Sequence, residues 1–339
     1  MKPYRLIPIL FALSCAPQIG WSQVKLPPPP TNAALLYWQA FAEMQDYPMD
    51  ESTAELLEKT LRGEAAWDEQ RLGHFVDDNL DAIRTMQRAS NLPQCDWGLE
   101  DTFEARNAFP VTYWQNSARS LARLNTLYGI REAASGDSQI ATDTWLAGIR
   151  FSQHLARGGT LIFKLVAEQA LLPNFGILAS VLRQGKLSVA EKARVKTAVQ
   201  ALPETVFDWG EAWALEGGLI EAGFREVLKS PDPIKAYEAF SGERAPEVAF
   251  PPSAKGSKTR PAILLADFAT FEDYMSRIQA ALAAPPPVAQ RRIEALNTEQ
   301  QSVSPLLQRF IPSPSHVNDA RTEIALARQR LLQAIAESH

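Results

Sequence analysis

The sequence predicts an all-α protein whose antiparallel helical hairpins pack as an irregular bundle or a short α-solenoid. Apolar residues recur at steps of three and four along most of the chain, which is the period of a helix, and no segment shows the alternation of a strand. Proline, glycine and serine clusters separate these runs into segments of helical length. This punctuation indicates roughly ten to twelve helices joined by short connections.

Residues 118–157 carry the clearest pattern and predict a central hairpin. Positions three or four apart, mostly apolar, define its two arms: Trp114, Ala118, Leu121, Asn125 and Tyr128 in the first, and Ile140, Thr144, Ala147, Phe151 and Leu155 in the second. Gly136 supplies the positive φ that ends a helix, and Asp137 or Ser138 caps the next one. Small residues, among them Gly148, allow the arms to approach closely. The turn resembles one tetratricopeptide-type hairpin, although no second copy follows at a fixed period.

The elements before the hairpin are bounded by caps and prolines. Thr31 or Asn32 caps a first helix, and the capping-box spacing of Ser52–Glu55 opens a short second helix. Asp68 begins one longer helix, which the Leu92–Pro93 pair ends. A less regular stretch follows, and Pro110 restarts the helix that leads into the hairpin.

Beyond the hairpin, a third apolar helix starts after Thr160, with Pro173 as a potential kink and Gly185 as its end. Ser188 begins a second capping box with Glu191. The remaining helices are expected at residues 188–202, 204–229, 234–240, 262–284, 288–301 and 320–335.

Four parts of the chain differ in composition. Residues 1–22 form a signal peptide, and residues 23–241 form an N-terminal helical domain. Residues 242–261 are a linker or loop rich in proline and lysine, and residues 262–339 supply C-terminal helices packed on the first part.

The N-terminus has the form of a secretory signal. Lys2 and Arg5 form a basic start, an apolar run too short to span a bilayer follows, and small residues precede a cut after Ser22. The sequence thus predicts an exported, periplasmic or extracellular protein. The alternative is a lipoprotein anchored to the membrane through Cys15, whose preceding residues loosely resemble a bacterial lipobox.

Charge and cysteine content narrow the classes of function. Without residues 1–22 the chain has 32 basic and 39 acidic residues, a net charge of −7, which disfavours a nucleic-acid partner. Only Cys95 remains, so no internal disulfide can form. No later apolar run reaches about 18 residues, so no transmembrane span is expected.

No metal, cofactor or catalytic motif stands out. The histidines lack zinc-site spacing, and no P-loop, dinucleotide fingerprint or nucleophile elbow appears, so neither a metal nor a cofactor is predicted. Glu216 and Glu221 lie among tryptophans on the 204–229 helix, where desolvation would suit a general acid. His154 is a further catalytic candidate. The simpler interpretation is an ordinary amphipathic helix, since five positions separate the two glutamates.

Several short motifs together suggest a family. They are Leu92–Gly98, Ala118–Leu124, Gly136–Asp137, Phe151–Ala156 and Pro305–Leu307 with Ala320–Arg321. The chain thereby resembles a group of exported, helix-rich bacterial proteins of unknown function, common in planctomycetes and acidobacteria. The resemblance implies an exported helical protein and brings no activity or cofactor with it.

If such a family has a site, the loop and hairpin faces that hold these motifs are where it would lie. The candidate binding residues are Cys95, Asp96, Trp97, Arg119, Arg123 and His154. Their simpler roles are a buried thiol, loop anchoring and salt bridges on a helix surface.

The first functional hypothesis is an exported scaffold that binds an envelope protein or other envelope component in a groove between helices. The second is an envelope hydrolase that uses Glu216 or Glu221, which requires convergence of carboxylates, or of a carboxylate and His154, in a deep pocket. The third is a carrier for an apolar ligand, which requires a sizeable cavity.

Overall fold

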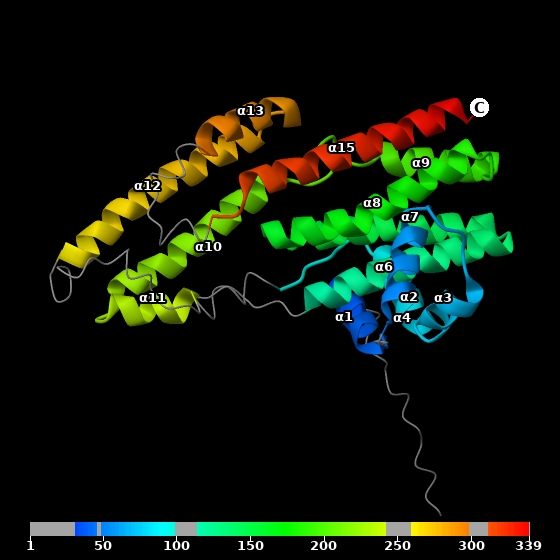
Figure 1. Cartoon of the computed structure of the whole chain (residues 1–339), viewed down its shortest axis with the longest axis horizontal. Coiled ribbons are helices and arrows are strands. Elements are labelled where there is room, and N and C mark those ends of the chain that lie inside the picture. The colour runs from blue at the N-terminus through cyan, green and yellow to red at the C-terminus, as the bar shows by residue number, and fades with distance from the viewer. Residues whose placement is uncertain (1–30, 46–48, 99–113, 242–258, 298–310, 339) are drawn as a thin grey trace, which may run out of the picture. The chain divides into compact units, whose positions relative to one another are not determined.

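A computed structural model describes residues 31–45, 49–98, 114–241, 259–297 and 311–338, and these residues form thirteen helices and no strand. In chain order the helices are α1 (Ala33–Glu43), α2 (Glu51–Leu61), α3 (Glu69–Asp77), α4 (Leu80–Ser90), α6 (Trp114–Ser135), α7 (Ser138–Ala156), α8 (Leu161–Arg183), α9 (Val189–Gln200), α10 (Trp209–Lys229), α11 (Pro233–Ser241), α12 (Thr259–Leu282), α13 (Pro286–Asn297) and α15 (Pro314–Glu337) (Figure 1). The all-α prediction is confirmed for this part of the chain. The predicted signal peptide, Cys15 and most of the predicted 242–261 linker lie outside the described residues.

Local signals placed several helix ends correctly. Gly136 has a φ of 97° between α6 and α7, and the Asp137 carboxylate accepts a hydrogen bond from the Ile140 amide at 2.9 Å. The capping box of Ser188 and Glu191 opens α9 as predicted. Pro173 lies inside α8 without ending it.

Other predicted helix boundaries are wrong. Helix α2 begins before the predicted capping box, because the Asp50 carboxylate accepts hydrogen bonds from the Ser52 hydroxyl and the Thr53 amide. The single helix predicted from Asp68 to Leu92 is split into α3 and α4 at Asn79.

The predicted helix from residue 204 also begins late. It starts at Trp209, with Asp208 as its cap. Val206, before it, has a φ of 60°, which a β-branched residue rarely adopts.

Helix α8 is the central helix of the main core and contacts α6, α7, α10 and α15. It is also long and apolar enough to cross a membrane, which the sequence analysis did not anticipate, yet most of it is buried by the other helices. Such burial is typical of a core helix in a water-soluble fold, so its length and composition are weak evidence for a membrane span.

Close helix packing in this core depends on two glycines. A Cβ atom at Gly129 of α6 would lie 2.8 Å from Cδ1 of Trp145 on α7. A Cβ atom at Gly148 of α7 would lie 2.7 Å from Nδ2 of Asn174 on α8. Gly148 therefore brings α7 close to α8, whereas Gly129 brings the two hairpin arms together.

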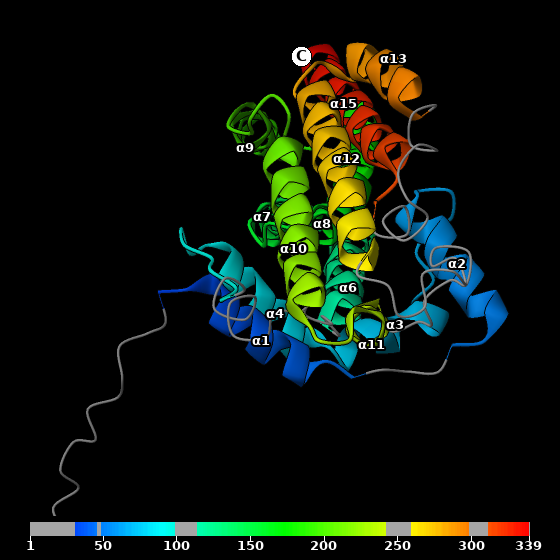
Figure 2. The ribbon, with the colours of Figure 1, turned by 90° about the vertical axis from the view of Figure 1, so that its left-hand side faces the viewer.

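The C-terminal helices are joined to this core by packing and by arginines. Helix α10 lies beside α12, as Figure 2 shows, and α15 packs on α8 and α13. Arg328 of α15 donates hydrogen bonds to the carbonyl oxygens of Leu202, Pro203 and Glu204 in the connection between α9 and α10. Helices on both sides of residues 242–258 are thus in contact.

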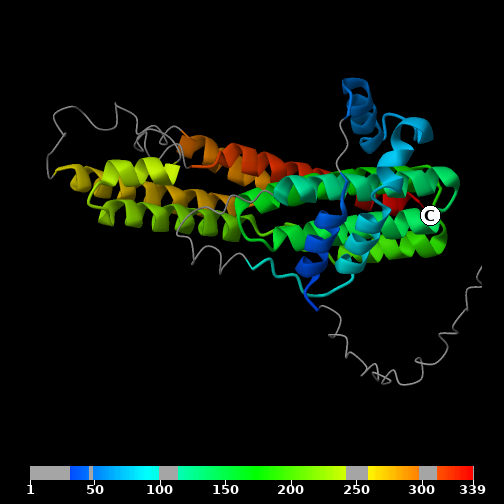
Figure 3. The same cartoon turned by 90° about the horizontal axis from the view of Figure 1, so that it is seen from below.

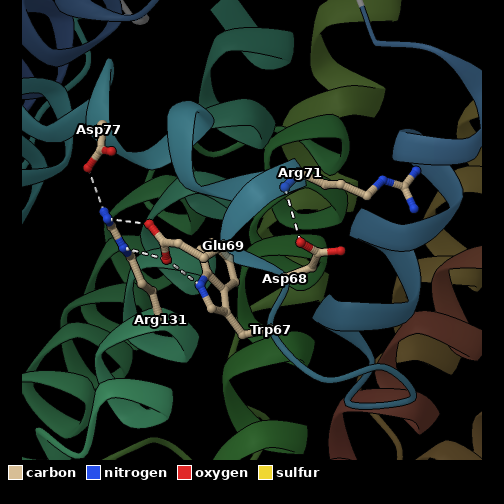
Figure 4. A network of polar contacts seen from close by, with 6 residues as sticks. All are labelled: Trp67, Asp68, Glu69, Arg71, Asp77 and Arg131. Atoms are coloured by element: carbon tan, nitrogen blue, oxygen red, sulfur yellow. Dashed lines mark hydrogen bonds and ion pairs between the residues drawn. The ribbon is translucent and has the colours of Figure 1, made fainter.

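Helices α2 and α3 form a smaller core against α6, while α1 packs beside α4 (Figure 3). Arg131 of α6 pairs with Glu69 and Asp77, near the two ends of α3, with nitrogen to oxygen distances of 2.6 Å (Figure 4). The Trp67 indole donates to the Glu69 carboxylate at 2.7 Å. This network holds α3, and with it α2, against the hairpin.

The glycine contacts predict opposite effects of one substitution at two helical positions. Gly129→Ala should destabilise the fold by about 1–3 kcal/mol, because a methyl group there overlaps the indole ring of Trp145. Gly176→Ala should stabilise it by about 0.5–1 kcal/mol, because its Cβ position is open and alanine favours helix. Urea denaturation of both variants measures the two changes. Equal effects at the two positions would contradict the proposed close contact between α6 and α7.

Candidate functional site

The largest hollow found in the described part of the chain lies where α2 and α6 meet α8, and its volume is about 660 Å³. A second hollow, of about 480 Å³, runs on between α8 and α15. Arg62, Leu172 and Gly176 line both, so the two hollows are continuous. We call this combined feature the α8 groove. It is lined by Glu58, Leu61, Arg62, Gly63, Glu64, Arg119, Arg123, Gln169, Leu172, Pro173, Phe175, Gly176, Ile177, Ala179, Ser180, Arg183, Glu323, Leu326, Ala327 and Arg330.

The groove combines an apolar floor with a charged rim. Phe175 and Leu61 are buried in the two cores beneath it, so the floor is held from both sides. The rim carries five arginines and three glutamates, an excess of positive charge on a chain whose net charge is −5. The charge of the lining is therefore opposite in sign to that of the whole chain.

Not all of these arginines are neutralised by the glutamates. Arg123 pairs with Glu58, and Arg62 pairs with Glu64 at 2.9 Å. Among the described residues, no ion pair involves Arg119, Arg183 or Arg330.

The donors of these three arginines are incompletely used. The Nε atom of Arg119 is buried without a hydrogen-bond partner, and Arg183 donates through Nε to the Ala179 carbonyl at 3.2 Å. Their remaining guanidinium donors are suited to a carboxylate, which arginine binds through two parallel hydrogen bonds.

The backbone of α8 adds one further polar group. Pro173 has no N–H, so the carbonyl of Gln169 lacks the donor that it would have in a regular helix. Both residues line the groove. Gly176 lies one turn further on, is exposed, and leaves open space where a side chain would project. The groove thus holds both the proline that interrupts the helical hydrogen bonds of α8 and an exposed glycine with open space beside it.

The structure places the sequence-predicted binding residues in different environments, and Asp96 is exposed outside the α8 groove. Arg119 and Arg123 line the α8 groove. Cys95, Trp97 and His154 lie instead in the main core, each less than one-tenth exposed.

The Cys95–Gly98 loop is anchored by its own hydrogen bonds. Asn32 bridges the backbone of Asp96, donating to its carbonyl at 2.7 Å and accepting from its amide at 2.9 Å. The Trp97 indole donates to the His154 carbonyl at 2.8 Å and stacks on Trp114. These contacts tie the start of α1 to the end of α7.

Cys95 and His154 have pKa values that oppose reactivity. Burial raises the pKa of the Cys95 thiol to about 12, so the thiolate nucleophile is suppressed at neutral pH. Burial and the nearby Arg157 and Arg150 lower the pKa of His154 to about 4. Its Nδ1 is hydrogen bonded to the Tyr37 hydroxyl at 2.8 Å. The neutral imidazole is thus part of the core.

The two candidate catalytic glutamates do not share a pocket among the hollows described. The half-buried Glu216 accepts a hydrogen bond from the Leu161 amide at 3.4 Å and so provides the first turn of α8 with the negative charge that its dipole favours. Burial raises the pKa of this carboxyl group. Glu221 pairs with Arg225 and lines a smaller hollow between α10 and α12.

Sequence reasoning did not single out Glu168, although this residue of α8 is more than nine-tenths buried. Burial, with a smaller contribution from Glu323 on α15, raises its pKa to about 7. Lys164, one turn earlier, is equally buried and donates to the Ala156 carbonyl at the end of α7 at 2.6 Å. Lys164 and Glu168 both interrupt an otherwise mostly apolar run of the sequence. This interruption is the feature from which sequence reasoning could have identified them as buried charges.

No family model matches this chain, and neither the curated proteins nor the solved structures contain a match. The predicted family resemblance therefore stays a prediction, and the interpretation of the α8 groove depends on its geometry alone.

The pKa of Glu168 predicts how stability depends on pH. An unfolded glutamate titrates near 4.5 and the folded one near 7, so the folded state holds an extra proton between these values. Stability is therefore lost as pH rises through this window, by about 3 kcal/mol above pH 7. Glu168→Gln should remove this loss and stabilise the protein at pH 8.5 while changing little at pH 4.5.

Urea denaturation at both pH values measures this difference between variant and wild type. The comparison is needed because His154, with its lowered pKa, contributes the opposite trend: stability is lost as pH falls from 6.5 towards 4. Asp319→Asn, at an exposed carboxylate of α15, is the matched control and should leave the free energy of unfolding unchanged at both pH values. An equal effect of Glu168→Gln at both pH values would refute the assignment.

Proposed function

We propose that this protein is a binding protein that holds an extended acidic peptide segment of a partner protein in the α8 groove. The observation that carries the proposal is the excess of positive charge around an apolar channel on an acidic chain. A partner with carboxylates and small apolar side chains is complementary to that lining in charge and polarity.

The construction of the groove supports binding rather than catalysis of a covalent step. Its walls come from rigid helices on two cores, so the ordering cost of a mobile binding surface is avoided. The titratable groups on its rim are five arginines and three glutamates, and two of these glutamates, Glu58 and Glu64, are paired with arginines. These groups position an anion and lack an activated nucleophile.

We propose further that the protein is exported to the cell envelope. The basic start, apolar run and small residues before position 23 support export, so the partner would be a protein of the cell envelope.

The test is a fluorescence anisotropy titration of the purified chain with a fluorescein-labelled, end-capped peptide, Glu-Ser-Val-Ser-Val-Ser-Glu. Its alternate residues place two glutamates and two valines on one face when it is extended. The chain should bind it, and the affinity should fall as salt is added, since arginine–carboxylate contacts are screened. A control peptide with lysine at both ends should bind at least ten-fold more weakly.

Gly176→Trp supplies the blocking variant. The indole would occupy open space in the groove and should weaken peptide binding at least ten-fold without unfolding the protein. Gly218→Trp is its matched control, because Gly218 is also an exposed helical glycine with open space beside it, on α10 outside the groove. Equal peptide affinity of the two variants would contradict the proposal that the peptide binds in the α8 groove. Binding of a fluorescent fatty acid in place of any acidic peptide would replace the proposed partner class.

A further inference from the structure

Resting on the proposed function, we infer that the groove recognises its peptide at two points, with one carboxylate held near Arg119 and a second held near Arg183 and Arg330. The distance between these points then sets which acidic segments fit. This assigns a length and a charge pattern to the partner, beyond its acidic character.

The arginines without ion pairs lie at opposite ends of the groove. Arg119 lines the hollow that reaches Gln169, whereas Arg183 and Arg330 line the hollow at the other end of α8. The pairs that are neutralised, Arg123 with Glu58 and Arg62 with Glu64, belong to the first hollow or to its junction with the second. Glu323 also lines the second hollow, so each end of the groove keeps one net positive charge: Arg119 at the first, and Arg183 with Arg330 less Glu323 at the second.

The length of α8 gives the spacing. Gln169, which lines the same hollow as Arg119, lies fourteen positions before Arg183 on α8, which corresponds to about 20 Å of helix. An extended peptide advances about 3.3 Å per residue, so about six steps cover the same distance. Two carboxylates at the first and seventh residues of an extended segment would face the two ends on the same side.

The channel between the ends selects what lies between the carboxylates. Leu172, Gly176 and Arg62 line it where the two hollows join, and Arg62 is neutralised there by Glu64. The middle of the groove therefore offers apolar contacts and no net charge to the segment between the two carboxylates. A fatty acid would satisfy only one end, because it has a single anionic group.

The experiment compares two peptides of identical composition and charge. Glu-Ser-Val-Ser-Val-Ser-Glu places its carboxylates six residues apart, and Val-Ser-Glu-Ser-Glu-Ser-Val places them two apart on the same face. Both are end-capped and labelled, and both are titrated with the wild-type chain, Arg119→Gln and Arg330→Gln. The widely spaced peptide should bind wild type at least ten-fold more tightly than the closely spaced one.

The arginine variants then locate the contacts. Each should weaken the widely spaced peptide by about ten-fold while changing the closely spaced one unequally, because that peptide reaches only one end. Arg84→Gln, at a cation outside the groove, is the control and should change neither peptide. Circular dichroism confirms that each variant is folded.

The outcomes separate this inference from the proposed function. Equal affinities for the two peptides, both lost in Gly176→Trp, would overturn the two-point arrangement and leave acidic-peptide binding in the groove intact. Failure of both peptides to bind the wild-type chain would overturn both proposals.

Discussion

The burial of α8 is the constraint on which the rest of the structure depends. Its mostly apolar surface has to be covered, and α6, α7, α10 and α15 together cover it. Covering one helix with four others leaves seams between the neighbours, and the α8 groove follows the seam that α2 and α15 only partly close. The candidate site is therefore a consequence of how the core helix is enclosed.

The same burial explains why charged groups in α8 and at its first turn have such specific partners. Lys164 loses hydration in the core and recovers part of it at the carbonyl end of α7, where the helix dipole favours a cation. At the other end of a helix, the Glu216 carboxylate of α10 accepts a hydrogen bond from the Leu161 amide in the first turn of α8, where the helix dipole favours an anion. Glu168 has no comparable hydrogen bond within the described residues, and burial, with Glu323 nearby, raises its pKa. Two of the three charges thus support the helix ends, and the third costs stability when it ionises.

Sequence reasoning succeeded where the determining interactions are local. The Gly136 turn, the Asp137 cap and the Ser188 box each depend on residues a few positions apart. It failed at Asn79, where α3 ends because the side chain accepts from the Gln45 amide and donates to the Phe75 carbonyl. The first of these contacts spans 34 positions and cannot be seen in a helical periodicity.

The groove was beyond sequence reasoning for the same physical reason, since its walls come from residues near positions 60, 120, 175 and 325. Arg119 and Arg123 were identified as candidates from the hairpin motifs alone, which gave no reason to associate them with Arg183 or Arg330. What joins these residues is the packing of α8 against α6 and α15. For this helical protein, the arginines that lack an ion pair among the described residues are thus a more informative guide to the candidate site than the sequence motifs.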